Sequence, residues 1–277
     1  MQLPTRLEYP LVAIGDLHGQ SEFLDRLIAK LRLLPEWPSL RIVFLGDLVD
    51  RGPDVKGTVQ RVMDLIAEKP GSTCVMGNHD LAFIQAAGLG GVRSDYWIRR
   101  WADAYDHALT FASYLGRTPE YHSYDDWMRD LDALRDSVPE SHRHFLANLP
   151  WLAEADGHLF LHNGLSPELG EPVGVQLELL RRKKWAGYVS PKPGTITALE
   201  YKPEYPVWLG ADKSLSMNPL PVPGRIQVTG HKLAETPDAN AVRIRIDTSG
   251  GRSEPLTGCV LRGPTTPPQF VFSTTET

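Results

Sequence analysis

The apolar residues of the N-terminal part follow a repeated pattern of strand, loop and helix. Apolar runs at 9–14, 40–45 and 73–76 each end at a glycine and predict short strands. The first two are followed by amphipathic stretches with helical spacing, over about 23–31 and about 53–68. Two strand–helix–strand units in succession predict a parallel sheet with helical crossovers.

The pattern changes after the third strand. Residues 81–150 are rich in aromatic side chains at helical spacing, which predicts a helical insertion whose aromatic stripe is core rather than recognition surface. Strand-like runs then resume at 158–161, 225–229, 242–247 and 256–261.

Two other segments have a different character. The many prolines of 186–224 predict a loop region without long regular elements. The tail 263–277 is expected to be weakly ordered, with 270–272 as the stretch that could add a last strand. The whole chain, 1–277, is predicted to be a single domain of class α/β.

Composition narrows the classes of protein. The 277 residues are 42% hydrophobic and 23% charged, as in ordinary globular proteins, which excludes disordered, collagen-like and coiled-coil chains. A net charge of -5 gives no general attraction to nucleic acid or an anionic membrane, so neither partner is expected. The sequence shows no membrane-spanning run and no signal peptide, which predicts a cytoplasmic protein. Cys74 and Cys259 lie in apolar surroundings and are interpreted as core residues rather than a disulfide.

Candidate chemistry follows three predicted strands at the point where each one ends. The three segments are Gly15-Asp16-Leu17-His18-Gly19, Gly46-Asp47-Leu48-Val49-Asp50-Arg51-Gly52 and Gly77-Asn78-His79-Asp80. Each alone is common turn chemistry. All three at the carboxyl ends of strands predict a functional site, because such ends meet at one edge of a parallel sheet.

These residue types suit a divalent metal. Hard oxygen donors combined with imidazole favour a first-row divalent ion, and the absence of a cysteine pair at ligand spacing argues against structural zinc. Asp16 and His18 can face one ion from the same loop. Asp47 can bridge two ions, and Asn78 can offer a carbonyl oxygen to the second.

Two further imidazoles end apolar strands beside glycines and can complete the second ion: His162 and His231. A single histidine in such a place is ordinarily a structural residue, but three acidic loops elsewhere in the chain favour ligands. The remaining histidines have no such context and are interpreted as structural or surface residues: His107, His122, His142, His144 and His158.

Two metal ions bridged by a carboxylate and a water hydrolyse phosphate esters, because they activate the water and neutralise phosphoryl oxygens. Arg51 can add a planar fork to those oxygens. His79 is then the natural general acid for the leaving group, and Asp50 can orient it.

Together the motifs resemble those of the calcineurin-like metallophosphoesterases, and specifically the phosphoprotein phosphatase branch with its bacterial serine/threonine phosphatases. The branch writes these motifs as GDxHG, GDxVDRG, GNHE, HGG or HAG, and GHT. The matching residues are Asp16-x-His18, Gly46-Asp47-x-Val49-Asp50-Arg51-Gly52, Gly77-Asn78-His79-Asp80, His162-x-Gly164 and Gly230-His231.

The resemblance implies a metallo-dependent phosphatase fold, in which two packed mixed β-sheets are flanked by helices. It implies two divalent ions, often manganese, with iron or zinc as alternatives. The implied ligands are Asp16, His18 and Asp47 for one ion and Asp47, Asn78, His162 and His231 for the other. The implied acid-orienting, acid and phosphate-binding positions are Asp50, His79 and Arg51, with Asn78 and His79 also at the phosphate.

The chain departs from the family pattern at three positions. Asp80 replaces the usual Glu, Asn163 replaces Gly or Ala, and Lys232 replaces Thr. None of these changes removes an expected ligand. The candidates for the family's second phosphate-binding arginine are Arg181 and Arg182, although a solvated helix face is the more ordinary interpretation.

The expected function is a metal-dependent phosphatase acting on phosphorylated Ser or Thr, and also Tyr, of proteins, with a hydroxide between the metals as nucleophile. The alternative is hydrolysis of dinucleoside polyphosphates such as diadenosine tetraphosphate. A third hypothesis, a binding protein on the same fold, is disfavoured because all expected ligands and His79 are present.

Overall fold

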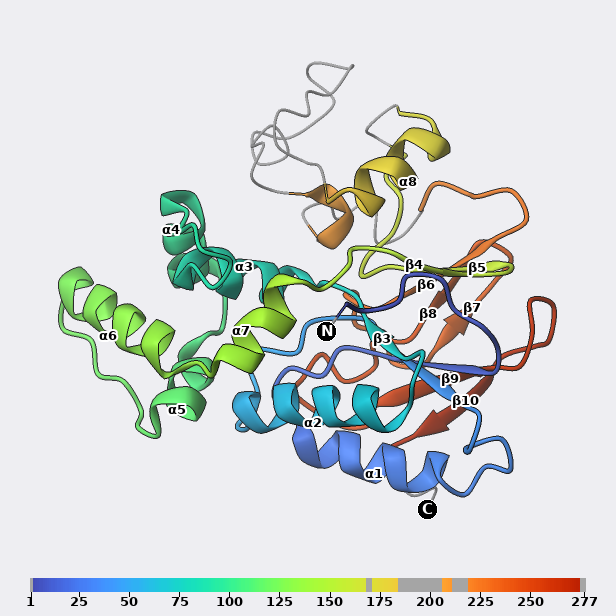
Figure 1. Ribbon diagram of the computed structural model, residues 1–277, viewed down its shortest axis with the longest axis horizontal. Helices are drawn as coiled ribbons and strands as arrows, with labels where there is room; N and C mark the ends of the chain where they lie inside the picture. Colours follow the sequence, from blue (N-terminus) through green and yellow to red (C-terminus); the bar gives the residue numbers. More distant parts are fainter. Residues whose placement is uncertain (1, 168–170, 184–205, 211–218, 275–277) are drawn as a thin grey trace.

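The computed structural model describes residues 2–167, 171–183, 206–210 and 219–274. Two five-stranded mixed sheets pack against each other, with helices on the outside (Figure 1). This architecture confirms the predicted α/β fold of two packed sheets.

The first sheet contains the predicted parallel unit. Its order is β10 (Gln269–Phe272), β9 (Thr257–Leu261), β1 (Leu11–Ile14), β2 (Arg41–Phe44) and β3 (Thr73–Cys74). Strands β1, β2 and β3 are parallel, whereas β9 runs antiparallel to both β1 and β10. The carboxyl ends of β1, β2 and β3 therefore lie at one edge.

The second sheet comes from the C-terminal half. Its order is β4 (Ala153–Ala155), β5 (His158–Phe160), β6 (Ile226–Thr229), β8 (Arg243–Arg245) and β7 (Asp238–Ala239). Strands β5, β6 and β8 are parallel, and the two edge strands are antiparallel to their neighbours. The parallel centre again gathers the carboxyl ends of its strands at one edge.

Strand β1 is buried on both faces. Leu11 and Ala13 belong to the core between the sheets, whereas Val12 and Ile14 belong to the larger core under the helices. This division follows from the two-residue period of a strand. The covering helices on that side are α1 (Ser21–Leu31) and α2 (Val55–Glu68), and α2 begins where the Asp54 carboxylate accepts the Gly57 N–H.

Residues 78–147 form the helical insertion, which extends away from the sheets in Figure 1. Its helices are α3 (Asn78–Ala87), α4 (Asp95–Ala104), α5 (Ala108–Leu115), α6 (Tyr124–Ser137) and α7 (Glu140–Ala147). Trp101 stacks on Phe111 and meets Trp127 edge to face, and all three are buried. These aromatic side chains are core, as the sequence analysis predicts, whereas Tyr124 is exposed.

The remaining segments include α8 (Val173–Arg181) and the short 3₁₀ helix η1 (Val207–Leu209). Of the proline-rich region 186–224, only 206–210 and 219–224 are described, so most of that prediction lies outside the described residues. In the tail expected to be weakly ordered, 269–272 form β10, which pairs with β9. Among the described residues, no helix is both long and apolar enough to span a membrane.

Candidate active site

The nine predicted site residues lie together where the carboxyl ends of the two sheets meet. Five of them lie on the loops after β1 and β2, and Asn78 and His79 lie at the N-terminus of α3. His162 and His231 follow the ends of β5 and β6. Every one has its side chain nearly or fully buried except Arg51 and His231, which are half-buried. Parallel strand ends, far apart in the sequence, thus converge as predicted.

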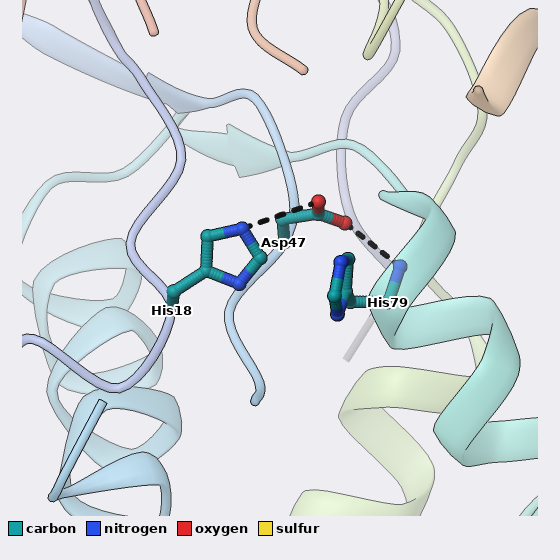
Figure 2. Close-up of side chains that lie close together, drawn as sticks. All are labelled: His18, Asp47 and His79. Atoms are coloured by element: carbon teal, nitrogen blue, oxygen red, sulfur yellow. Dashed lines mark hydrogen bonds and ion pairs between the residues drawn. The ribbon is translucent and has the colours of Figure 1, made fainter. Parts of the chain in front are cut away.

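Asp47 lies at the centre of the site. Its Oδ2 is 3.5 Å from His18 Nε2, and its Oδ1 accepts the His79 backbone N–H at 2.9 Å (Figure 2). The same Oδ2 is 3.3 Å from His162 Nε2. The carboxylate therefore belongs to two groups of possible metal-ligating atoms: His18, Asp47 and His79, and Asp47, His162 and His231. A carboxylate shared by two donor groups is the arrangement that a pair of ions requires.

Backbone carbonyls orient two of these imidazoles. His18 Nδ1 lies 2.8 Å from the Val49 carbonyl, and His162 Nδ1 lies 2.7 Å from the Leu45 carbonyl. Each contact leaves Nε2 directed toward Asp47. Anchoring of the second ring nitrogen is typical of metal-binding histidines.

Asp16 and Asn78 contact the second-sheet side of the site. Both carboxylate oxygens of Asp16 are 3.1 Å from the His231 N–H, and Asn78 Oδ1 is 3.1 Å from His162 Nε2. Gly230 permits this approach, because a Cβ there would lie 2.0 Å from Asp16 Oδ1. On the His18 side, the donor group contains His79 where the sequence analysis expects Asp16. The role of Asp16 as a ligand stays a prediction.

The strongest electrostatic interaction within the site is between Asp47 and His162. Burial raises the pKa of Asp47, but His162 and His79 outweigh it and hold that pKa well below its usual range. Burial lowers the pKa of His162, yet Asp47 and Asp16 raise it to about 10. The negative centre thus draws a proton onto an imidazole, and a bound cation would replace that proton.

For the other three expected donors, Asp16, His18 and His231, burial is the largest cause of the pKa shift. Burial, and then the charge of Asp247, raises the pKa of Asp16. Burial, followed by neighbouring His79, lowers the pKa of His18, and burial with His162 lowers that of His231 to about 3. Two neutral imidazoles are therefore ready to act as ligands, and the buried Nδ1 of His231 has no hydrogen-bond partner among the described residues. The donor set fits divalent cations.

Asp50 and His79 form a hydrogen-bonded pair beside the ion positions. His79 Nδ1 lies 2.7 Å from Asp50 Oδ2. The same Oδ2 accepts the Trp101 indole N–H at 3.1 Å, and Oδ1 accepts the Thr110 hydroxyl at 2.6 Å. The contact with Asp50 thus occupies Nδ1 of His79 and leaves Nε2 facing the site.

Arg51 spans the His18 and His79 rings. Its Nη1 is 2.9 Å from His18 Nε2 and donates to the Gly250 carbonyl at 2.8 Å, and its Nη2 is 3.1 Å from His79 Nε2. Nε has no partner. The planar guanidinium thus lies among the site residues, and its role in binding phosphoryl oxygens stays a prediction.

The site holds its backbone in an unusual conformation. Of the six non-glycine residues with positive φ in the described part of the chain, five belong to the site: His18, Asp47, Asp50, Arg51 and His231. A left-handed non-glycine residue costs about 1–3 kcal/mol. The surrounding structure must therefore impose this geometry.

Two of the departures from the family pattern are structural in different ways. The Asp80 carboxylate accepts the N–H groups of Asp47, Leu48 and Gly77 at 2.8, 2.9 and 3.0 Å, so it joins the β2 loop to the start of α3. Burial, and then Asp47, raises the pKa of Asp80 to about 6. Asn163 is buried beside His162, and neither of its side-chain polar atoms has a partner among the described residues.

The two arginines considered for phosphate binding lie elsewhere. Arg181 forms an ion pair with Glu154 of β4, and Arg182 pairs with Glu178 on its own helix. Both also line a cavity of about 500 Å³ with the N-terminal segment and α7. That candidacy is wrong, because a buried edge-strand carboxylate and the exposed face of α8 take up these side chains.

Sequence reasoning did not find Trp101 and Thr110, which contact Asp50 from the helical insertion. Their surroundings are those of ordinary core residues, so no local signal distinguishes them. The sequence analysis also assigns no role to the loop after β8, whose first residues it includes in the strand-like run 242–247. There Asp247 accepts the Gly250 N–H, and Gly251 packs on the His18 ring so closely that a Cβ would lie 2.1 Å from His18 Cβ.

Comparison with known proteins gives a consistent result. Residues 9–232 match the model of a family described as calcineurin-like phosphoesterase. The chain is 31% identical over 188 residues to a symmetrical bis(5'-nucleosyl)-tetraphosphatase of Ralstonia nicotianae, covering 65% of this chain and 53% of that protein. A protein of the same name from Janthinobacterium is 27% identical over 192 residues, covering 68% and 57%. The chain thus spans about half the length of these curated relatives.

Among solved structures, a cold-active protein tyrosine phosphatase superposes with a TM-score of 0.54 at 19% identity, covering 98% of this chain and 81% of that one. At this identity the similarity shows the fold alone. The relatives' names favour the dinucleotide alternative over the phosphoprotein phosphatase that the sequence analysis places first.

Proposed function

The chain belongs to the calcineurin-like phosphoesterase family, and we propose that it hydrolyses dinucleoside polyphosphates such as diadenosine tetraphosphate with the help of two divalent metal ions. One observation carries the choice of substrate: two relatives are both named symmetrical bis(5'-nucleosyl)-tetraphosphatase. The convergence of the nine site residues around Asp47 supports the reaction class.

The proposed ligands are those that the sequence motifs imply. Asp16, His18 and Asp47 hold one ion, and Asp47, Asn78, His162 and His231 hold the other. When bound, two divalent cations of the manganese, iron or zinc type supply an activated water and neutralise phosphoryl oxygens.

The other residues act on the phosphoryl group and the leaving group. Arg51 binds two phosphoryl oxygens through its planar fork, with Asn78 and His79 beside it. His79 donates a proton from Nε2 to the leaving oxygen, while the Asp50 carboxylate holds Nδ1–H at 2.7 Å. The helix N-terminus on which Asn78 and His79 lie adds favourable potential for an anionic substrate.

A second candidate, a phosphatase acting on phosphorylated Ser, Thr or Tyr of proteins, is favoured by the Asp50–His79 pair. A nucleoside diphosphate leaves as a stabilised anion and needs little protonation, whereas a serine alkoxide needs a proton as it departs. A well-oriented general acid is therefore worth most to the second reaction.

The test is a direct comparison at equal enzyme concentration with added manganese. We expect kcat/KM for diadenosine tetraphosphate to exceed that for phosphoserine and phosphotyrosine peptides by more than about tenfold. Symmetrical cleavage should yield ADP as the sole nucleotide product. The reverse ranking would assign a protein phosphatase, and no turnover of any substrate would revive the binding-protein hypothesis. An Asp47→Asn preparation run in parallel controls for contaminating phosphatase.

A further inference from the structure

The Asp50–Arg51 segment touches the helical insertion through both of its backbone N–H groups and through both carboxylate oxygens of Asp50. The Thr110 hydroxyl donates to Asp50 Oδ1 at 2.6 Å and accepts the Asp50 N–H at 3.0 Å. The Trp101 indole N–H donates to Asp50 Oδ2 at 3.1 Å. The Arg51 N–H donates to the Asp106 carbonyl at 3.0 Å.

These contacts act on the least favourable stretch of backbone in the site. Asp50 and Arg51 are consecutive non-glycine residues with φ of +68° and +65°. Two adjacent left-handed residues do not persist without external support. The support comes from residues 101–110. The two side chains that contact Asp50, Trp101 and Thr110, lie 51 and 60 positions further along the chain.

The supporting residues are themselves rigidly packed. Trp101 and Thr110 are fully buried, and Trp101 stacks on Phe111 at 5.4 Å between ring centroids. Tyr105 meets the far side of the pair, with its ring edge to face on His79 at 4.6 Å. The insertion thus encloses the Asp50–His79 pair with residues whose rotamers are fixed by packing.

We propose that Trp101 and Thr110 are positioning residues for proton donation: through Asp50 they hold the His79 imidazole on the leaving-group oxygen. Helices α4 and α5 of the insertion are then a working part of the active site, in addition to α3 with Asn78 and His79, rather than only a core. This inference rests on the proposed role of His79 as the general acid.

The contacts at Asp50 bear on the proton-transfer step of the reaction. Both carboxylate oxygens of Asp50 accept hydrogen bonds. If one of these bonds is lost, the carboxylate can rotate and turn the His79 imidazole away from the leaving-group oxygen. The two hydrogen bonds of the Thr110 hydroxyl are both to Asp50 and not to an expected metal ligand. Arg51 keeps its own anchors without Thr110, at the Asp106 carbonyl through its N–H and at the Gly250 carbonyl through Nη1. Loss of the hydroxyl should therefore harm reactions in proportion to their need for a proton.

Thr110→Val is the principal test, because it removes the hydroxyl and nearly keeps the shape. The measured quantity is kcat on phenyl phosphate, whose leaving group has a pKa of about 10 like that of tyrosine, beside kcat on p-nitrophenyl phosphate, whose leaving group is stable. We expect a loss of about tenfold on phenyl phosphate and of less than about threefold on p-nitrophenyl phosphate. Thr110→Ser keeps the hydroxyl and should restore the ratio of the two rates.

A matched control is available at Thr58, which is fully buried on α2 and whose hydroxyl has no partner among the described residues. Thr58→Val should leave the ratio unchanged. Trp101→Phe provides a second route if Thr110→Val does not fold. Its control is Trp127→Phe, which removes an indole N–H that points to His107 instead of Asp50.

A double variant separates positioning from general damage. In a His79→Asn background, Thr110→Val should have no further effect on either substrate, because the acid it positions is gone. Equal losses on the two substrates, or a further loss in that background, would overturn the inference. If His79→Asn itself shows no dependence on the leaving group, the proposed acid fails instead, and the two failures are thereby distinguished.

Discussion

The two sides of Asp47 are built in different ways. On one side, His162 and His231 end neighbouring parallel strands of the second sheet, and ladder hydrogen bonds and one carbonyl contact place them. On the other side, Asp50 and His79 depend on side chains of the helical insertion. The ligand side is thus a product of the sheets, and the acid side is a product of two regions that meet.

Because the two sides are built differently, we expect them to tolerate different sequence changes. Sheet register places His162 and His231 wherever the strands form, and the only helix that adds a proposed ligand on this side is α3, through Asn78 at its N-terminus. The acid side combines left-handed backbone at Asp50 and Arg51 with contacts that cross 51 to 60 residues of sequence. Changes in the insertion should therefore alter leaving-group dependence and spare metal content.

The largest effect is expected at the residue that both sides share. Asp47→Asn removes the charge that holds two cations together and keeps the shape of the side chain. Because two ions supply several kcal/mol of charge stabilisation, we expect turnover to fall by about 10³-fold or more on every substrate. Metal analysis beside kinetics is the measurement.

Its control is Asp103→Asn, which removes an exposed carboxylate on α4. Two ions per chain with a near-normal rate in the Asp47 variant would remove Asp47 from the bridge.

The next effect should fall on the acid side alone. His79→Asn is expected to keep both metal ions and the fold, while turnover of alkyl phosphates falls by about 10²- to 10⁴-fold and that of p-nitrophenyl phosphate far less. The ratio of the two losses is measured, with the exposed His122→Asn as a control.

Equal losses, or loss of metal, would contradict the acid role. Loss of metal would instead make His79 the third member of the donor group with His18 and Asp47, which the structure places together.

Arg51→Lys tests the acid side through the phosphate. An ammonium keeps the charge but cannot make two parallel bonds, so we expect kcat to fall by about tenfold, or about 1.4 kcal/mol. Arg61→Lys makes the same exchange at a surface ion pair with Asp25. Unchanged kinetics in the Arg51 variant would show that this side chain lies off the phosphate.

The smallest effect concerns the stability of the insertion. His142 is buried on α7 between Tyr114 and Gln60, and burial, followed by Lys56, lowers its pKa below the usual 6.5. Below about pH 6.5 the unfolded chain takes up a proton that the folded chain refuses, so stability should fall as the pH falls.

His142→Gln should flatten this slope between about pH 7 and pH 5, as measured by urea unfolding at several pH values. A slope equal to that of the wild type would show that His142 ionises as freely in the folded state as in the unfolded one.

The sequence predicts the strand ends that carry the proposed ligands well because its signals there are local. A strand that ends at a glycine followed by an acidic residue or a histidine can be recognised from its neighbouring residues alone. The predicted strand at 40–45 accordingly differs from β2 (Arg41–Phe44) by one residue at each end. Strands β4 and β7 escaped prediction because three and two residues are too few to show a period.

The support of the acid side could not be predicted. Nothing near Thr110 or Trp101 shows that either would reach Asp50, since the contact exists only after the insertion folds back. The same reason explains Arg181, whose basic neighbourhood on α8 gives no sign of the Glu154 carboxylate that binds it.

The left-handed residues of the site also set a limit on engineering. Glycine is the substitution that such backbone favours, so His231→Gly would relieve conformational strain while deleting a side chain whose buried Nδ1 has no partner among the described residues. Selection for heat resistance alone would therefore reward the loss of catalysis at this position. Stability and activity are in direct conflict here, and any search for a hardier variant has to screen for turnover at every round.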